Sequence, residues 1–229
     1  MNSEKSVSRL LGVIFLIVAV ASLSSGLLLG VIDYSLIKPP TDIATSMQNM
    51  AAHVAIMQSS FVVMLFEAVG IVLLAVLLYT VLNTQNMFMA RWALGLWIVE
   101  AVSLVVRATS ISLLLMTSRE FVQTNASDVS HFLSLGQLFY HLSQFAYSVL
   151  MLFYSVGGLV FYSLFLKSKY IPKAISLWGI IAVVLGLAGI VAGFFDMAIP
   201  LIVFLPILPF ELTIGLWLMI KGVKRAALE

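Results

Sequence analysis

The chain has no cysteine among its 229 residues, and only 10% of its residues are charged. Without cysteine there is no disulfide, no thiolate nucleophile, no cysteine-ligated metal and no covalently attached haem. Soluble domains carry roughly 25% charged residues, so this composition lies far outside their range. The net charge of +2 is too small to indicate nucleic acid as a partner.

The chain is rich in apolar residues. Hydrophobic residues make up 62% of the chain and the mean hydropathy is +1.13, which indicates an integral membrane protein. Because a tilted helix needs about 20 to 25 residues to cross a bilayer, the chain has room for about six or seven helices in one bundle. We therefore expect a single helical domain over residues 1–229.

Six apolar runs are long enough to span a membrane, and they predict an all-α polytopic protein. The runs cover about residues 10–32, 54–82, 92–116, 138–166, 175–196 and 199–220. The first run also fits a signal peptide with cleavage after Ala19-Val20-Ala21. That interpretation is the weaker one, because the run continues to Ile32 and is too long for a signal core.

The basic residues outside these runs predict the orientation. Cytoplasmic loops carry the excess of Lys and Arg near helix ends, so the richer side is the cytoplasmic one. Both termini are therefore predicted to be cytoplasmic, which requires an even number of spans. The richer side holds Lys5, Arg9, Arg91, Lys167, Lys169, Lys173, Lys221, Lys224 and Arg225, and the other side holds Lys38 and Arg119.

The second span is predicted to begin well outside the bilayer. Thr41 or Asp42 is a suitable N-cap, and no glycine or proline interrupts the chain before Gly70. A helix of forty residues would reach about 60 Å, so its first turns project outward. Their apolar stripe either packs on an outward extension of the 138–166 helix or rests on lipid headgroups. The stripe consists of Ile43, Met47, Met50, Val54 and Met57.

Small residues at four-residue spacing, Ser22, Gly26 and Gly30, predict a close helix contact in the first span. We assign it no function.

Four ionisable residues inside the apolar runs are the main functional candidates: Glu67, Glu100, Arg107 and Glu211. Such groups are costly near the bilayer centre and normally face a partner, a cavity or a ligand. Counted from the span limits, all four lie within about two turns of the midplane. We therefore predict one buried layer of charge, in which neutral carboxyls share protons or a cation is bound.

Two features favour binding, and one alternative stays open. Pro206 and Pro209 precede Glu211 and free backbone carbonyls, which suits a cation. The polar residues of the 138–166 span, among them His141 and Gln144, predict an entry path from the outer side. The alternative is that the buried charges only tie helices together.

No metal site is predicted. A three-histidine zinc site fails because His131 and His141 are about 15 Å apart along one helix.

Most of the chain resembles a bacterial family of six-span membrane proteins known as a domain of unknown function, and the C-terminal half is the more specific part of this resemblance. The resemblance rests on Lys167 to Gly179, Pro206 to Leu212, Gly215 to Leu218 and Lys221-Gly222, and also on Trp97 to Ala101 and Ser118 to Val122. It implies an all-helical bundle in the bacterial cytoplasmic (inner) membrane. It attaches no activity, cofactor or oligomeric state.

Three functions are compatible with these patterns. The first is a binding or transport protein for a cation, a proton or an amphipathic ligand at Glu67, Glu100, Arg107, Glu211, His141 and Gln144. The second is an intramembrane enzyme with Glu100 or Glu211 as base and Arg107 as oxyanion stabiliser. The third is a structural or regulatory partner of another membrane protein. We rank the first highest, and besides the lipid bilayer we expect a small cationic or amphipathic ligand.

Overall fold

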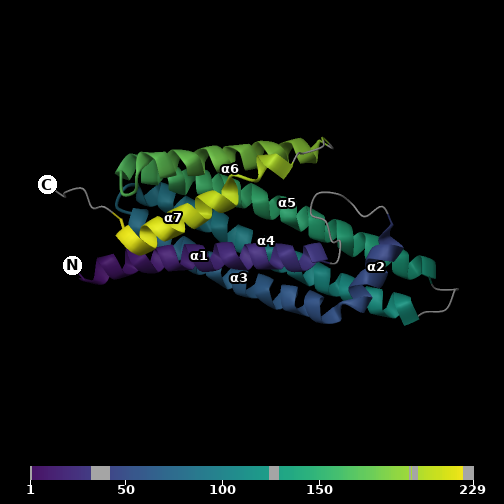
Figure 1. Ribbon diagram of the computed structural model, residues 1–229. Coiled ribbons are helices and arrows are strands. Elements are labelled where there is room, and N and C mark those ends of the chain that lie inside the picture. The colour runs from purple at the N-terminus through teal and green to yellow at the C-terminus, as the bar shows by residue number, and fades with distance from the viewer. Residues whose placement is uncertain (1, 32–41, 124–128, 196, 198–200, 224–229) are drawn as a thin grey trace. The chain divides into compact units, whose positions relative to one another are not determined.

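The computed structural model of the chain describes residues 2–31, 42–123, 129–195, 197 and 201–223 (Figure 1). These residues form helices and no strand. In chain order the elements are α1 (Asn2–Val31), α2 (Ile43–Ala52), α3 (Val54–Leu82), α4 (Met87–Gln123), α5 (Val129–Ser168), α6 (Lys173–Phe194), the 3-10 helix η1 (Leu201–Val203) and α7 (Ile207–Lys221).

Five of these helices, α1, α3, α4, α5 and α6, are long and apolar enough to cross a membrane. The all-helical membrane fold is thereby confirmed, and each of the five contains or nearly matches one apolar run of the sequence. The last run, 199–220, forms η1 and α7 instead of one long helix. Since α7 has 15 residues, it is shorter than the roughly 20 that a span needs. The six spans and the cytoplasmic termini remain predictions.

The helix expected to run from residue 41 or 42 to residue 82 is broken, and this prediction was wrong. Ala52 ends α2 and Val54 begins α3, with His53 between them. The backbone N–H of His53 donates to the Met50 carbonyl at 3.1 Å, three residues back instead of four. Its ring Nδ1 lies 2.8 Å from the Asn49 carbonyl oxygen. These local bonds replace the regular helical ladder, so that α2 and α3 take different directions (Figure 1).

The chain divides into two compact units. Unit 1 comprises residues 1–20, 69–101 and 150–229, and unit 2 comprises residues 21–68 and 102–149. Each boundary falls inside a helix, so α1, α3, α4 and α5 each contribute one part to either unit. The two units are described separately below, and the single domain stays a prediction.

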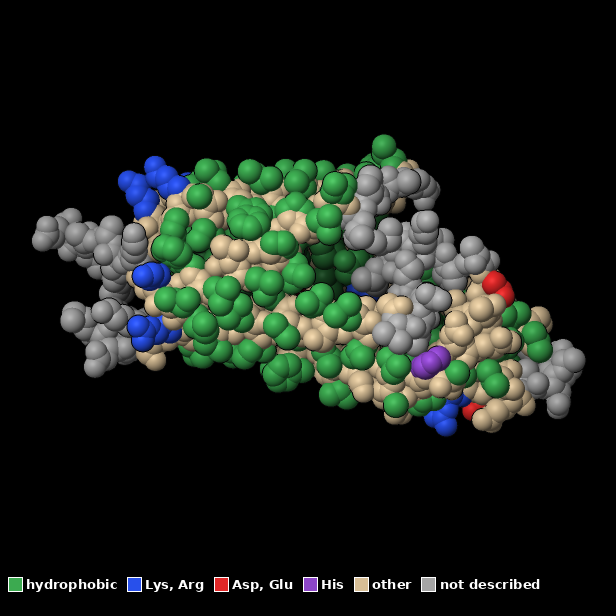
Figure 2. All heavy atoms as spheres, in the orientation of Figure 1, with side chains coloured by type: hydrophobic (Ala, Val, Ile, Leu, Met, Phe, Trp, Pro, Cys, Tyr) green, Lys and Arg blue, Asp and Glu red, His purple; other side chains and the backbone are tan. Residues whose placement is uncertain are grey.

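Exposed basic side chains gather at one end of unit 1, where α1 begins and α7 ends (Figure 2). A Cβ on Gly222 would lie 2.8 Å from the Ser8 hydroxyl, so these two helix ends are neighbours. The Tyr170 hydroxyl accepts a hydrogen bond from Gln85 Nε2 at 2.9 Å, which joins the α5–α6 turn to the α3–α4 turn. The exposed basic residues of this unit are Arg9, Arg91, Lys167, Lys169, Lys173 and Lys221.

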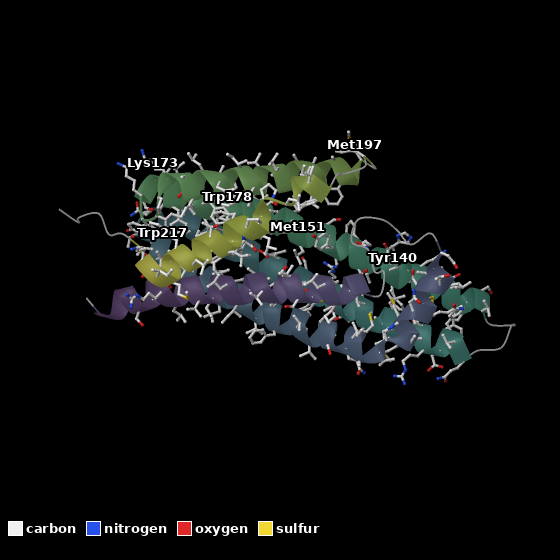
Figure 3. All side chains as sticks on the ribbon, viewed as in Figure 1. Tyr140, Met151, Lys173, Trp178, Met197 and Trp217 are labelled. Carbon is white, nitrogen blue, oxygen red and sulfur yellow. The ribbon has the colours of Figure 1, made fainter. Side chains whose placement is uncertain are left out.

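Trp178 and Trp217 lie toward the Lys173 end of unit 1 (Figure 3), as aromatic anchors at a membrane interface do. Apolar side chains cover much of the visible faces of α6 and α7 (Figure 2), consistent with contact to lipid. Lys38, Lys224 and Arg225, and the side chain of Lys5, lie outside the part that is described.

In unit 1, α1 and α7 approach each other closely at Gly12. A Cβ on Gly12 would lie 2.6 Å from the Gly215 carbonyl oxygen and 2.7 Å from the Leu218 carbonyl carbon. Glycine is therefore required at residue 12, because these atoms belong to the backbone and cannot rotate away. The sequence placed the close contact at Gly26 and Gly30 instead, where an added Cβ meets no described atom within 4 Å. That prediction was wrong.

In unit 2, α2 packs on α4 and α5 through its methionines. Met47 and Met50 are both buried, at 0% and 1% exposure. A Cβ on Gly136 of α5 would collide with the Met47 sulfur, and the Ser118 hydroxyl of α4 lies 3.9 Å from the Met50 sulfur. Of the two alternatives for the apolar stripe, these contacts show packing on the extension of the 138–166 helix.

Asp42 caps the N-terminus of α2, while Thr41 lies outside the described residues. Its carboxylate accepts hydrogen bonds from the Thr45 hydroxyl at 2.7 Å and from the Ala44 N–H at 3.0 Å. These bonds, first that of Thr45 and then that of Ala44, hold the pKa of Asp42 below its ordinary value of 3.8. The cap fixes where α2 begins.

Candidate functional site

An acidic site in unit 1 joins α5 to α7. The Tyr154 hydroxyl donates to the Glu211 carboxylate at 2.8 Å. Glu211 is half-buried and Tyr154 is 7% exposed, so this bond is largely shielded from the surroundings. A hydrogen bond to a carboxylate in such a setting is stronger than one in water.

Proline fixes the start of the helix that carries Glu211. Pro206 is the N-cap residue of α7, and Pro209 falls in its first turn, where the missing N–H costs no helical hydrogen bond. The Pro206 carbonyl accepts from the Phe210 N–H at 3.3 Å, and the Pro209 carbonyl accepts from the Thr213 hydroxyl at 2.7 Å. Both carbonyls are thus engaged within α7. The carbonyls that a proline frees lie three and four residues before it, and their role beside Glu211 stays a prediction.

Aromatic rings surround this acidic site. Trp97 of α4 stacks on Tyr154 with ring centroids 6.1 Å apart and an angle of 9° between the planes. Its indole N–H donates to the Tyr154 carbonyl at 3.2 Å, which fixes both rings. Tyr162 packs edge to face against Phe210, the residue before Glu211, at 4.8 Å. Tyr154, which binds the carboxylate, is therefore itself held in place by aromatic packing.

Glu100 belongs to the same unit and lies one helical turn after Trp97 on α4. It is 5% exposed. Both Glu100 and Glu211 act electrostatically on the hydroxyls of Tyr154 and Tyr162. Unit 1 thus brings two of the four predicted residues to one pair of tyrosines.

A second buried site lies in unit 2. The Arg107 guanidinium stands over the Tyr147 ring, with Cζ 4.4 Å from the ring centroid, which is a cation–π contact. Glu67 also acts electrostatically on Tyr147. The Ser25 hydroxyl lies 3.5 Å from Glu67 Oε2 and thereby links α1 to α3. Glu67 and Arg107 are 7% and 5% exposed.

His141 and Gln144 both lie close to Tyr140 on α5. His141 is exposed, and its ring packs edge to face on Tyr140 at 5.7 Å. Gln144 is half-buried and lies within hydrogen-bonding reach of the Tyr140 hydroxyl. Their predicted role as an entry path is not tested by these contacts.

The four ionisable residues fall into two pairs, Glu100 with Glu211 in unit 1 and Glu67 with Arg107 in unit 2. Their convergence in one layer remains a prediction, and so does the enzyme hypothesis, which needs Arg107 beside Glu100 or Glu211. In the described part of the chain, no three His, Asp or Glu side chains are grouped so as to hold a metal ion.

Sequence reasoning missed Trp97 and Tyr154 as parts of the site. A signal was present, because Tyr140, Tyr147 and Tyr154 recur at seven-residue spacing and so share one face of α5. Sequence reasoning considered only the polar residues around His141 and Gln144, because Tyr154 stands in a strongly apolar stretch.

Comparison with known families gives one match. The family described as "Domain of unknown function (DUF4386)" matches residues 10–222, which is nearly the whole chain. This match confirms the resemblance stated from the sequence. No curated protein and no solved structure matches the chain.

Proposed function

We propose that this chain, which belongs to the DUF4386 family, is a multi-pass protein of the bacterial cytoplasmic membrane that binds or carries a cation at Glu211. The observation that carries the proposal is the hydrogen bond of 2.8 Å between the Tyr154 hydroxyl and the Glu211 carboxylate. The cation is a proton or a lipophilic amine, since a single carboxylate attracts both.

The membrane arrangement is supported by the ends of unit 1. The first turns of α1 and the last turn of α7 are neighbours, as expected if the chain crosses the membrane an even number of times. The exposed basic residues lie at this end, and the excess of Lys and Arg marks the cytoplasmic side. We take η1 and α7 together, residues 201–221, as the sixth crossing.

The chemistry of the acidic site suits a cation with an apolar body. A carboxylate neutralises the positive charge, and aromatic rings attract cations through their faces while burying apolar groups. Trp97, Tyr154 and Tyr162 supply these rings. Tyr154 also orients the carboxylate, so that one oxygen, Oε1, is held and the direction of the group is fixed.

Unit 2 is the less suitable place for a cation, because Arg107 brings a positive charge to the same tyrosine that Glu67 acts on. Like charges repel strongly where the dielectric constant is low. We therefore assign cation binding to unit 1.

Binding of tetraphenylphosphonium to the protein in nanodiscs tests this proposal, with empty nanodiscs as the background. We expect saturable binding by the wild type. Glu211→Gln removes the charge at nearly constant shape and should weaken binding by about tenfold or more, which corresponds to about 1.4 kcal/mol. Binding should also weaken as the pH falls, since a protonated carboxyl carries no charge, and Glu211→Gln should lose this pH dependence.

Glu120→Gln is the matched control, because Glu120 is an exposed glutamate of unit 2 on α4. It should bind tetraphenylphosphonium as the wild type does. If Glu211→Gln and Glu120→Gln bind equally well while both remain folded, Glu211 does not hold the cation and the helix-tying role is favoured.

A further inference from the structure

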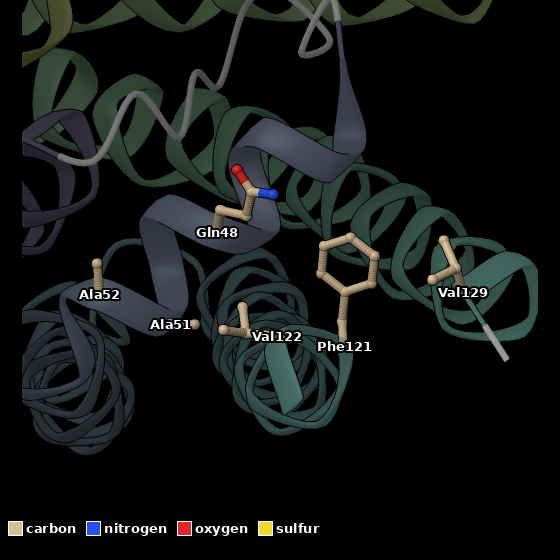
Figure 4. Close-up of a pocket in the computed structure, with 6 residues that line it drawn as sticks. All are labelled: Gln48, Ala51, Ala52, Phe121, Val122 and Val129. Carbon is tan, nitrogen blue, oxygen red and sulfur yellow. The ribbon is translucent and has the colours of Figure 1, made fainter. Parts of the chain in front are cut away.

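A pocket in unit 2 is separate from the charged sites. It has a volume of about 380 Å³ and lies where α2, the end of α4 and the start of α5 meet (Figure 4). This volume is within the range of roughly 300 to 1,000 Å³ that is typical of small-molecule sites. The lining residues are Gln48, Ala51, Ala52, Phe121, Val122 and Val129.

The lining is apolar except for one amide. Phe121 and the two valines supply apolar surface, and the alanines leave space where larger side chains would fill the pocket. Of the six lining side chains described, Gln48 is the one that offers hydrogen bonds, with a carbonyl acceptor and an NH₂ donor. Among the lining residues that the structure describes there is no Asp, Glu, Lys or Arg, so these walls offer no charged side chain to a ligand.

The place of the pocket makes this apolar lining informative. Phe121 and Val122 lie five and six residues beyond the apolar run that ends at residue 116, about 8 to 9 Å along the helix. The surrounding chain is polar there, with Ser118, Arg119 and Glu120 just before them. Contact with lipid tails does not explain apolar side chains in a polar segment beyond the apolar run. A bound ligand would explain them.

The walls are held in a fixed arrangement by the packing of α2. Met47 and Met50 anchor one face of α2 on α5 and α4, which leaves Gln48, Ala51 and Ala52 on the face toward the pocket. These three residues are spaced i, i+3 and i+4, so they form one strip along the helix. The packing of α2 on α4 and α5 therefore forms the pocket in advance, and a ligand can bind without any rearrangement of α2.

We propose that this pocket binds a small uncharged molecule with an apolar ring system and one hydrogen-bonding group, which Gln48 recognises. The size, the apolar walls and the single amide together select this chemistry over a charged headgroup. The site is independent of the cation site at Glu211, since all six lining residues belong to unit 2.

Two probes of the same shape test the proposal: 2-naphthol, which carries a hydroxyl group, and 2-methylnaphthalene, which does not. Equilibrium dialysis measures their binding to nanodiscs with and without the protein. We expect saturable binding of 2-naphthol to the wild type above the empty nanodiscs. Gln48→Leu should weaken 2-naphthol by about fivefold, the value of one neutral hydrogen bond, and leave 2-methylnaphthalene within about twofold.

A pair of alanine substitutions tests the location. Ala52 lines the pocket and Ala55, three residues later, does not, although both are exposed. Ala52→Phe should fill the pocket and weaken both probes by about tenfold or more, whereas Ala55→Phe should change binding by less than about twofold. The proposal is overturned if the wild type shows no saturable binding, or if the two alanine variants lose binding equally. It is also overturned if light scattering shows that the protein dimerises and that Ala52→Phe abolishes the dimer, because the pocket would then be part of a contact between two copies.

Discussion

Each unit places a glutamate beside a tyrosine of α5, at Glu211 and Tyr154 in unit 1 and at Glu67 and Tyr147 in unit 2. The two tyrosines are seven residues apart on one helix. Their further neighbours differ in charge: unit 1 adds the carboxyl of Glu100, and unit 2 adds the guanidinium of Arg107. The same helix face thus supports an acidic site in one unit and a charge-balanced site in the other.

This difference indicates how each site is used. A balanced group of one acid and one base can stabilise helix packing without any ligand, although the desolvation of both charges offsets much of the gain. Two carboxyls that act on the same pair of tyrosine hydroxyls repel each other as anions, and a proton or another cation relieves this repulsion. Unit 1 is therefore the better candidate for binding and unit 2 for structural support.

The largest effect is expected from the contact that builds unit 1. Gly12→Ala would force the backbones of α1 and α7 apart, and we expect a loss of stability of about 3 kcal/mol or more. Gly26→Ala on the same helix meets open space and should change stability by only about 1 kcal/mol or less. Thermal unfolding in detergent, followed by circular dichroism, measures both. Equal effects of the two substitutions would contradict the close approach at Gly12.

Next in size is the hydrogen bond of the acidic site. Tyr154→Phe keeps the ring that stacks on Trp97 but removes the donor to Glu211, and we expect a loss of about 2 kcal/mol. Tyr79→Phe in α3 is the control, since it removes a tyrosine hydroxyl elsewhere in unit 1. If Tyr154→Phe is as stable as Tyr79→Phe, the hydrogen bond does not contribute to folding.

In unit 2 the cation–π contact should contribute less. Tyr147→Phe retains an aromatic face for Arg107 and should leave stability within about 0.5 kcal/mol, whereas Tyr147→Leu removes it and should cost about 1 kcal/mol more. Chemical unfolding of both variants in the Arg107 and in the Arg107→Gln background isolates the pairwise energy. A Tyr147→Leu effect that persists unchanged without Arg107 would assign it to packing alone.

The smallest and most local effect concerns the cap of α2. The lowered pKa of Asp42 means that its ionised form stabilises the folded helix above the ordinary pKa of 3.8. This contribution is lost as the pH falls through the lowered value. The protection of the α2 amides against hydrogen exchange, taken relative to the intrinsic exchange rate at each pH, should therefore decrease as the pH falls below the ordinary value of 3.8 and Asp42 loses its charge. Asp42→Asn, which cannot ionise, should abolish this pH dependence while α5 exchanges as before.

The apolar runs predicted most of the helices, because the length and hydropathy of a local segment are enough to indicate a membrane-spanning helix. The boundaries of α3 agree with the run from residue 54 to residue 82. The break at His53 was missed, since it arises from local hydrogen bonds of a histidine that is not a strong helix breaker. The close contact at Gly12 was missed as well, because a single glycine in a span has no spacing that marks it.

For the candidate sites, the sequence identified the costly side chains but not their partners. Glu100, Glu211, Glu67 and Arg107 stand out because charge is rare inside an apolar run. Trp97 and Tyr154 do not stand out, since aromatic residues are common in membrane helices. Which carboxyl faces which tyrosine depends on helix rotation, and periodicity along one helix does not determine how it is rotated against the next.

The account can be tested most directly by measuring tetraphenylphosphonium binding to two variants side by side, Glu211→Gln from unit 1 and Glu67→Gln from unit 2. Both substitutions remove one carboxylate that acts on a tyrosine of α5. The account predicts that Glu211→Gln weakens binding by about tenfold or more, while Glu67→Gln stays within about twofold of the wild type. Retained binding in Glu211→Gln together with lost binding in Glu67→Gln would contradict it.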